Sequence, residues 1–197
     1  MLPINLTKIV EYLVRNIPGK FNVNQVARNL KISVGSAYKI LKSLEKKQIL
    51  VSEKIGNGIY YALNLSSRET ENLIQLVLIE SRNKSLAKNP QASIYAKDLQ
   101  ETKKLSKAVI LFGSILDRKN VNDIDALFIV DKGKTKGVED FCLKLSSLRP
   151  KRVNPLLMTA ADFRKNIKKQ DKIIADILEK GIILFGENEI IKILRGV

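Results

Sequence analysis

The sequence predicts an α+β protein with two folded parts joined by a helical connector, and three observations support this. Residues 6–47 contain three stretches with apolar side chains at helical spacing, and residues 49–65 contain two alternating apolar runs around a glycine-rich turn. After residue 107, short apolar runs typical of buried strands alternate with helical stretches. At 197 residues the chain is long enough for two small domains. We place the domain boundaries at residues 1–65, 66–105 and 106–197.

The charge of the chain favours a polyanionic partner. There are 35 Lys and Arg against 20 Asp and Glu, which gives a net charge of +15. The excess is most one-sided in residues 1–62, with 10 basic and 3 acidic side chains, and no long run of like charges marks a disordered tail. Nucleic acid, nucleotide or both are the partners that such a charge predicts.

Two residue types are scarce, and their scarcity excludes several kinds of site. The chain has no histidine, which excludes His-based catalysis and the usual zinc sites. A single cysteine, Cys142, cannot form an intrachain disulfide, and we expect its side chain to point from a helix into the hydrophobic core. No apolar run is long enough for a signal peptide or a membrane span, so we expect a soluble cytoplasmic protein and no membrane partner.

The N-terminal third predicts three helices followed by a hairpin. The first helix covers residues 6–16 and ends before Pro18-Gly19. Asn22 or Asn24 can cap a second, short helix, and Ser33 can cap a third that runs to about residue 47. The runs ILVSEKI and IYYALNL then flank Gly56-Asn57-Gly58, a strong signal for a β-hairpin.

These elements, most clearly VNQVARNLKISVGSAYKILKSLEKKQILVSEKIGNGIYYAL, resemble the winged helix-turn-helix regulators of the multiple-antibiotic-resistance and arsenical-resistance type. The resemblance implies double-stranded DNA as partner, with the third helix in the major groove and the hairpin along the backbone. It places Ser33, Ser36, Tyr38 and Lys39 near bases and Lys42, Lys46, Lys54 and Asn57 near phosphates. Winged helices also serve as protein-interaction modules, and Tyr38 can equally pack against the hairpin.

Residues 66–105 predict a helical connector. Ser66 or Ser67 can cap a helix from about Arg68 to Ser81, which the segment NKSLAKNPQAS then interrupts, and a second polar helix is expected over residues 91–106. Neither helix has enough apolar surface for a domain of its own. We therefore expect them to pair with each other or to form the interface of a homodimer.

The C-terminal part contains the residues that suggest a chemical site. The strand-like run AVILF ends in Gly113-Ser114, and Asp123 and Asp125 stand two residues apart at the start of the strand-like run DIDALFIV. A period of two places both carboxylates on one face of a strand, where they can bind one Mg²⁺. Gly113 allows backbone to approach a phosphate, and Ser114 offers a hydroxyl at a helix start. The alternative is that the two aspartates are only a polar strand entry.

The segment LFGSILDRKNVNDIDALFIV resembles the DNA-polymerase-β-type nucleotidyltransferases, especially the minimal ones of bacteria and archaea, over residues 106–190. The resemblance implies a small mixed β-sheet with helices on one side. It assigns Gly113 and Ser114 to the triphosphate, and Asp123 and Asp125 to the catalytic Mg²⁺ site. The family's third carboxylate would stand in RVNPLLMT, where this chain has Asn154. An amide can coordinate a metal but cannot act as a base, so the departure bears on catalysis more than on binding.

Three further charged residues in the C-terminal part bear on this site. Arg118 and Lys119 can neutralise a triphosphate or simply form a solvated loop, and Asp162 is expected to belong to a helix cap at Thr159. Two functions remain open. One is a prokaryotic transcriptional regulator whose second domain binds Mg²⁺ and a nucleoside triphosphate, with impaired catalysis. The other is an active enzyme that transfers a nucleoside monophosphate to a hydroxyl of a small molecule or of a protein acceptor, as in toxin-antitoxin pairs.

Overall fold

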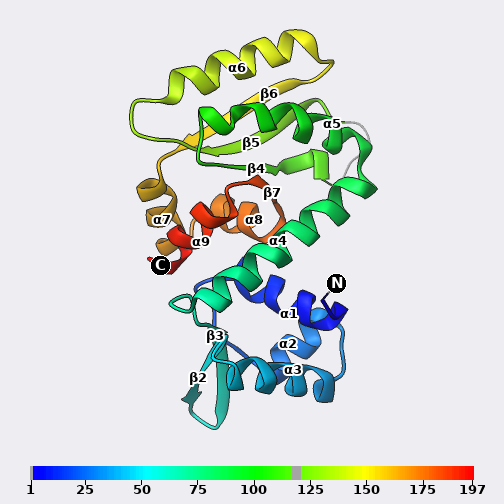
Figure 1. Ribbon diagram of the computed structural model, residues 1–197, viewed down its shortest axis with the longest axis vertical. Coiled ribbons are helices and arrows are strands. Elements are labelled where there is room, and N and C mark those ends of the chain that lie inside the picture. Colours follow the sequence, from blue (N-terminus) through cyan, green and yellow to red (C-terminus); the bar gives the residue numbers. More distant parts are fainter. Residues whose placement is uncertain (1, 117–120) are drawn as a thin grey trace. The chain divides into compact units, whose positions relative to one another are not determined.

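A computed structural model describes residues 2–116 and 121–197 of the chain and shows an α+β protein (Figure 1). The chain divides into two units, one that extends to Val77 and one from Leu78 to Gly196. This division falls inside helix α4 (Arg68–Lys88), within the segment that the sequence predicted as a connector. Each unit has its own β-sheet, with three strands in the first and four in the second.

The first unit contains three helices and a three-stranded sheet. In chain order the elements are α1 (Ile4–Arg15), β1 (Phe21–Asn22), α2 (Val23–Leu30), α3 (Val34–Lys46), β2 (Leu50–Ile55) and β3 (Gly58–Leu63). The strand order is β1-β3-β2, and all pairs are antiparallel. Three helices followed by a hairpin form the winged helix-turn-helix arrangement, in which β2 and β3 make the wing.

Local signals in the sequence account for the boundaries of these helices. The side chain of Asn22 accepts a hydrogen bond from Gln25 N at 2.9 Å, and Gln25 returns one to Asn22 N, which completes a capping box. Ser33 caps α3 as predicted, since its Oγ accepts from Ser36 N at 3.2 Å. The wing turns at Gly56-Asn57, where Gly56 has a φ of +58° that favours glycine. Strand β1 was not predicted, because its two residues are too short to show a pattern.

Helix α4 is longer than the sequence predicted. It runs to Lys88 rather than ending near Ser81, because the stretch from Arg82 to Lys88 contains no glycine or proline. The helix ends at Lys88, two residues before Pro90, whose ring disfavours helical geometry in the preceding Asn89. The next helix, α5, covers Pro90–Leu99 and continues as a 3-10 helix over Gln100–Lys104, close to the predicted 91–106.

The second unit is built on a mixed sheet in the order β6-β5-β4-β7. Its strands are β4 (Ala108–Phe112), β5 (Asp123–Ile129), β6 (Arg152–Met158) and β7 (Ile182–Phe185). Strand β4 pairs antiparallel with β5 and β7, whereas β5 and β6 are parallel. The helices are α6 (Thr135–Leu148), α7 (Ala160–Lys168), α8 (Lys172–Lys180) and α9 (Glu187–Arg195). Pro155 lies in β6, which is an edge strand and therefore tolerates a residue without a backbone N–H.

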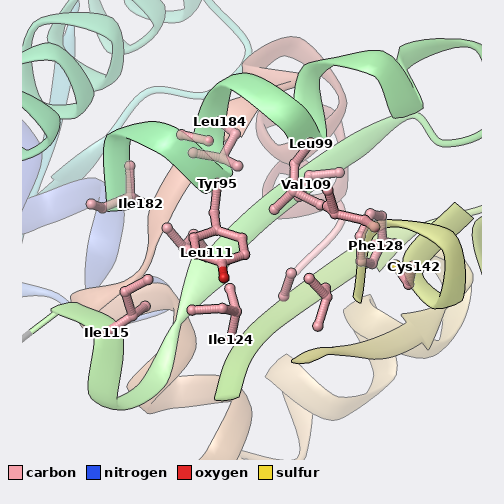
Figure 2. Close-up of a cluster of buried hydrophobic side chains, with 14 of the residues drawn as sticks. Tyr95, Leu99, Val109, Leu111, Ile115, Ile124, Phe128, Cys142, Ile182 and Leu184 are labelled. Carbon is pink, nitrogen blue, oxygen red and sulfur yellow. The ribbon is translucent and has the colours of Figure 1, made fainter. Parts of the chain in front are cut away.

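Helices cover both faces of this sheet, which corrects the expectation of helices on one side (Figure 1). Side chains of α5 and α6 pack with Val109, Leu111 and Phe128 in a single apolar cluster (Figure 2). The opposite face meets α7, α8 and α9. A Cβ built on Gly181 at the end of α8 would lie 2.5 Å from Cγ2 of Ile110, which alternates with Val109 and Leu111 along β4. The sheet is therefore a central layer.

Cys142 lies in the cluster between α6 and the sheet, as predicted, with 1% of its surface exposed. Burial raises the pKa of the thiol to about 11, which keeps it neutral at physiological pH. Among the described residues, none of the helices combines the length and the continuous apolar character that are needed to cross a bilayer.

Candidate functional site

Helix α3 presents a polar and partly apolar surface to solvent. Its opposite side is buried through Ala37, Leu41 and Leu44, which recur at helical spacing. On the outer side, Tyr38 is 51% exposed, so about half of its surface is accessible to a partner. A Cβ built on Gly35 would meet no atom within 4 Å, so no neighbour in the described chain requires a glycine there.

The two serines assigned to base contacts already have partners within the first unit. Ser33 Oγ caps α3 through Ser36 N, and Ser36 Oγ accepts from Asn5 Nδ2 at 3.2 Å. The latter bond joins α1 to the first turn of α3. Both hydroxyls therefore position the helix, and any contact with a base would be additional to these bonds.

The ammonium group of Lys42 already has partners in the first unit, in a network that joins α3 to the wing. Its Nζ lies 2.7 Å from Glu45 Oε2 and 5.9 Å from the ring centre of Tyr61, while Ser52 Oγ donates to Glu45 Oε1. The hydrogen bond with Glu45 raises the pKa of Lys42, and the same bond together with that from Ser52 lowers the pKa of Glu45. Lys42 is thus a less available phosphate ligand than the sequence suggested.

The remaining predicted DNA ligands lie on the surface without such a network. Lys39 and Lys46 are exposed on the outer side of α3, and Lys54 and Asn57 are exposed on the wing. Glu53, which precedes Lys54 in β2, pairs with Lys20 across the sheet. The side chains with the freest cationic groups are therefore at the outer face of α3 and near the hairpin tip.

In the second unit, the register of the sheet brings together residues that are far apart in the sequence. Asp125 is the Cα partner of Phe112 on β4 and of Asn154 on β6. Directly paired residues share one face of a sheet, and Asp123 shares it with Asp125 because they are two positions apart. Asp123, Asp125 and Asn154 are all half-buried. The structure thus places Asn154 beside the two aspartates.

Gly113 lies against the same group of residues. Its φ is +78°, and a Cβ at this position would lie 2.5 Å from Asp125 Oδ2. Any other residue would therefore clash with the carboxylate as well as strain the backbone. Ser114 follows in a 3-10 helix over Gly113–Leu116, so its hydroxyl lies at a helix start, as the sequence predicted. Arg118 and Lys119, also assigned to the nucleotide, lie outside the described residues.

The electrostatics of this group are those of two carboxylates that repel each other. Asn154 Nδ2 donates to Asp123 Oδ2 at 2.7 Å. Burial raises the pKa of Asp125, the charge of Asp123 raises it further, and an interaction with Asn154 acts in the opposite direction. A cation bound between the carboxylates would relieve the repulsion. The oxygen-rich set of Asp123 and Asp125 fits Mg²⁺, and the missing side chain at Gly113 leaves the space that the Asp125 carboxylate occupies.

The described residues contain no group of three or more Asp, Glu, Cys or His side chains that could hold a metal, which is consistent with an amide in the third position. Arg152 is a candidate that the sequence analysis missed. It is exposed, and it is the Cα partner of Asp123 just as Asn154 is that of Asp125. The signal in the sequence was the same period of two, Arg152-x-Asn154 against Asp123-x-Asp125, but it became visible only once the strands were paired.

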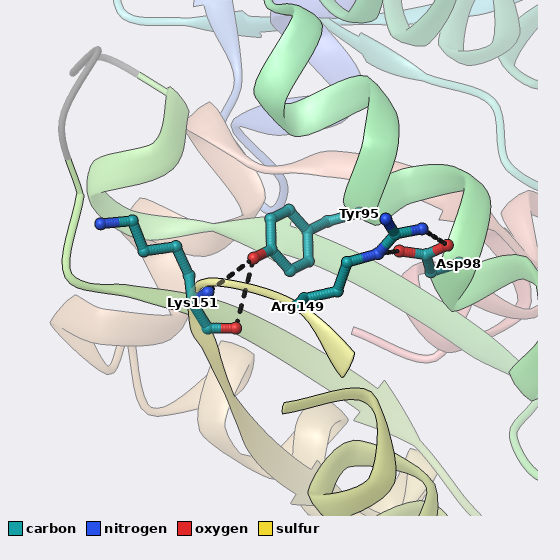
Figure 3. Close-up of polar contacts among 4 residues, drawn as sticks. All are labelled: Tyr95, Asp98, Arg149 and Lys151. Atoms are coloured by element: carbon teal, nitrogen blue, oxygen red, sulfur yellow. Dashed lines mark hydrogen bonds and ion pairs between the residues drawn. The ribbon is translucent and has the colours of Figure 1, made fainter. Parts of the chain in front are cut away.

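Contacts before β6 fix the position of Asn154. Tyr95 on α5 donates through its hydroxyl to Lys151 O at 3.2 Å and accepts from Lys151 N at 3.0 Å (Figure 3). Arg149 makes a bidentate pair with Asp98, with N···O distances of 2.7 and 2.8 Å. Both contacts tie α5 to the short segment that leads into β6, so this strand enters the sheet in a defined register.

Comparisons with known proteins leave the family of this chain open. No family model matches it, and neither does any curated protein. Solved structures similar to it include ZitR of Lactococcus lactis, a zinc-responsive MarR family member, at 16% identity over 53% of this chain and 76% of that chain, with a TM-score of 0.36. A homodimeric winged helix-turn-helix DNA-binding domain of Mycobacterium bovis, a possible ArsR-family transcriptional regulator, is 18% identical over 40% and 68%, with a TM-score of 0.33.

A third similar structure is human N-acetylserotonin methyltransferase, at 19% identity over 31% of this chain and a TM-score of 0.27. The chain spans only 19% of the length of that enzyme. Because all three TM-scores are below 0.5, these similarities carry no argument about function. A functional assignment therefore depends on the geometry of each unit.

Proposed function

We propose that this protein is a DNA-binding transcriptional regulator whose second unit binds a Mg²⁺-nucleotide. The observation that carries the DNA-binding part is the outer face of α3. Alanine in place of a glycine whose backbone geometry it can adopt stabilises a protein by about 0.4–1 kcal/mol, and no neighbour in the described chain requires Gly35. A partner that approaches the helix closely, such as the edges of base pairs in a major groove, supplies a reason for it.

The charges around this face suit a duplex. Lys39 and Lys46 follow Gly35 along the outer side of α3, and Lys54 extends the basic surface onto the wing. Phosphate contacts of this kind supply most of the affinity for DNA and make it depend steeply on salt. We place α3 in the major groove and the wing along the adjacent backbone.

A salt titration with two charge variants tests this proposal. We expect the affinity of the full chain for a random-sequence duplex to fall as salt rises, and Lys39→Ala with Lys46→Ala to weaken binding and reduce the salt slope by about one to two. Lys165→Ala with Lys168→Ala is the matched control, because it removes two charges from exposed sites on α7 in the second unit. Binding that ignores both salt and the α3 variants would refute the proposal.

The nucleotide-binding part rests on the convergence of Gly113, Asp123, Asp125 and Asn154, where β4 ends and the neighbouring strands β5 and β6 begin. Asp123 and Asp125 are the residues that would hold Mg²⁺, and the ion would neutralise charge on the phosphates. Gly113 leaves its backbone accessible to a phosphate, and Ser114 and Arg152 would bind further phosphate oxygens. Calorimetric titration of each nucleoside triphosphate with Mg²⁺ tests this, with Asp123→Asn/Asp125→Asn as the variant that should abolish binding.

A transferase remains the second candidate, favoured by the same convergence of residues. Transfer to a hydroxyl, whether of a small molecule or of a protein, requires a group that takes the proton of the hydroxyl. Asn154 cannot do so, and here its amide is a hydrogen-bond donor to Asp123. We therefore expect binding without efficient transfer.

We also propose a homodimer, which would present two copies of α3 to DNA. Two-fold related half-sites would then be spaced by about 34–36 Å, one helical turn, or by a multiple of it. Light scattering of the full chain tests the oligomeric state independently of DNA.

A further inference from the structure

Two apolar side chains stand on the N-terminal half of α3 where a DNA-reading helix usually presents polar groups. Val34 is 52% exposed and Tyr38 is 51% exposed. They are four residues apart, so they lie next to each other on the helix surface. Gly35, which adds no side chain, lies beside them and leaves the helix backbone open to a close partner.

The first unit buries only about half of the surface of each of these residues. The core side of α3 is filled by Ala37, Leu41 and Leu44, each at most 2% exposed. Val34 and Tyr38 lie at the edge of that buried stripe, on the side that leads to the outer face. Their apolar surface is therefore available to whatever α3 contacts.

The chemistry of the major groove offers one apolar group, the C5-methyl of thymine. We propose that Val34 and Tyr38 contact thymine methyl groups and give the protein a preference for A·T pairs at the positions they reach. This inference rests on the proposed DNA binding and specifies what α3 reads. Charge favours DNA over an apolar protein surface as the occupant, because the exposed cations Lys39 and Lys46 share the outer side of the helix.

Deoxyuridine provides the test, because it differs from thymidine only by this methyl group. A duplex would first be selected from randomised DNA with the full-length chain, and each thymine would then be replaced singly by uracil. Burial of one methyl-sized group corresponds to about fourfold in affinity. We expect one or more thymines at which the replacement weakens binding by about this factor.

Two variants connect the effect to the side chains. Val34→Ala and Tyr38→Ala should each lose the discrimination between thymine and uracil at its own position. Because both residues are half-exposed, the variants should fold, and far-UV circular dichroism checks this. Lys39→Ala is the matched control, since it should weaken both duplexes equally.

The outcomes separate this inference from the function on which it rests. Selected DNA that tolerates uracil at every thymine, or that contains no thymine, overturns the inference but leaves DNA binding intact. Discrimination that persists in both variants overturns it as well. Failure to select any duplex refutes the proposed DNA binding itself, and association of the chain with itself through α3 would show that a second copy occupies this face.

Discussion

Asn154 donates a hydrogen bond from Nδ2 to Oδ2 of Asp123 at 2.7 Å, across the parallel pair of strands β5 and β6. The amide thus places a partial positive charge beside a carboxylate where a third carboxylate would have placed a negative one. This contact holds Asp123 in position without a metal. Because an amide is not a base, the position of Asn154 offers no group that could accept a proton. This is the structural reason to expect binding without transfer.

Asn154→Asp should make the stability of the protein depend more strongly on Mg²⁺. The substitution replaces a hydrogen-bond donor by a like charge, which should lower the free energy of unfolding by about 1–3 kcal/mol in the absence of metal. Mg²⁺ should restore most of this loss, and incorporation of labelled nucleotide should increase. Thermal unfolding with and without Mg²⁺ measures the effect. Asn83→Asp, at an exposed position of α4, is the control, and an equal loss with and without Mg²⁺ would contradict the prediction.

The pKa of Asp125 predicts how stability depends on pH. Burial and the charge of Asp123 raise this pKa above its usual value of 3.8, so the folded chain holds the proton more tightly than the unfolded chain. The contribution of Asp125 to stability is therefore largest at low pH and decreases as pH rises through the folded pKa. Asp125→Asn should remove this decrease and stabilise the metal-free protein at pH 7, but not at pH 3, by a few tenths to about 1 kcal/mol.

Asp131 provides a control of opposite sign. Lys107 holds the pKa of Asp131 below its usual value, so this carboxylate contributes stability that is present at neutral pH and lost as pH falls. Asp131→Asn should therefore destabilise the protein at pH 7 and have no effect at low pH. Denaturant unfolding at several pH values measures both variants, and curves that shift in the same direction would contradict the assignment.

Tyr95→Phe should destabilise the second unit by about 1–3 kcal/mol. The hydroxyl of Tyr95 bonds to both the N–H and the C=O of Lys151, and its loss leaves two half-buried backbone groups unpaired while the apolar packing of the ring is retained (Figure 3). Chemical denaturation measures the loss. Tyr60→Phe on the wing is a matched control that should change stability little, and an equal effect of both would show that the contact with Lys151 is unimportant.

How far the sequence could predict this structure depends on the range of the interactions. The cap at Ser33, the turn at Gly56-Asn57 and the strand that begins at Asp123 depend on neighbours within a few residues, and all three were predicted correctly. Helices on both faces of the sheet were not, because local periodicity shows that a helix has an apolar side but not which face that side covers.

The candidate site shows the same limit. The aspartate pair and its glycine could be recognised from spacing, whereas the partnership of Asp123 with Arg152 depends on strand pairing between residues 29 positions apart. The pairing of Lys42 with Glu45 follows helical spacing, but its continuation to Ser52 and Tyr61 required the wing to fold back on α3. Long-range register and side-chain competition therefore decide which predicted ligands are free.

Gly35→Ala should separate the stability of the fold from its function. Alanine is the better helix former and its Cβ meets nothing within 4 Å, so the variant should be more stable by about 0.5–1 kcal/mol. Its affinity for DNA should nevertheless fall, because the added methyl group stands between the helix and the base edges. Chemical denaturation and a binding titration on the same preparation measure both effects. Ser43→Ala, at an exposed position of the same helix, should leave both nearly unchanged. A Gly35→Ala variant that is more stable and binds as tightly as the original chain would mean that no ligand approaches α3 closely, and the placement of this helix in the major groove would have to be abandoned.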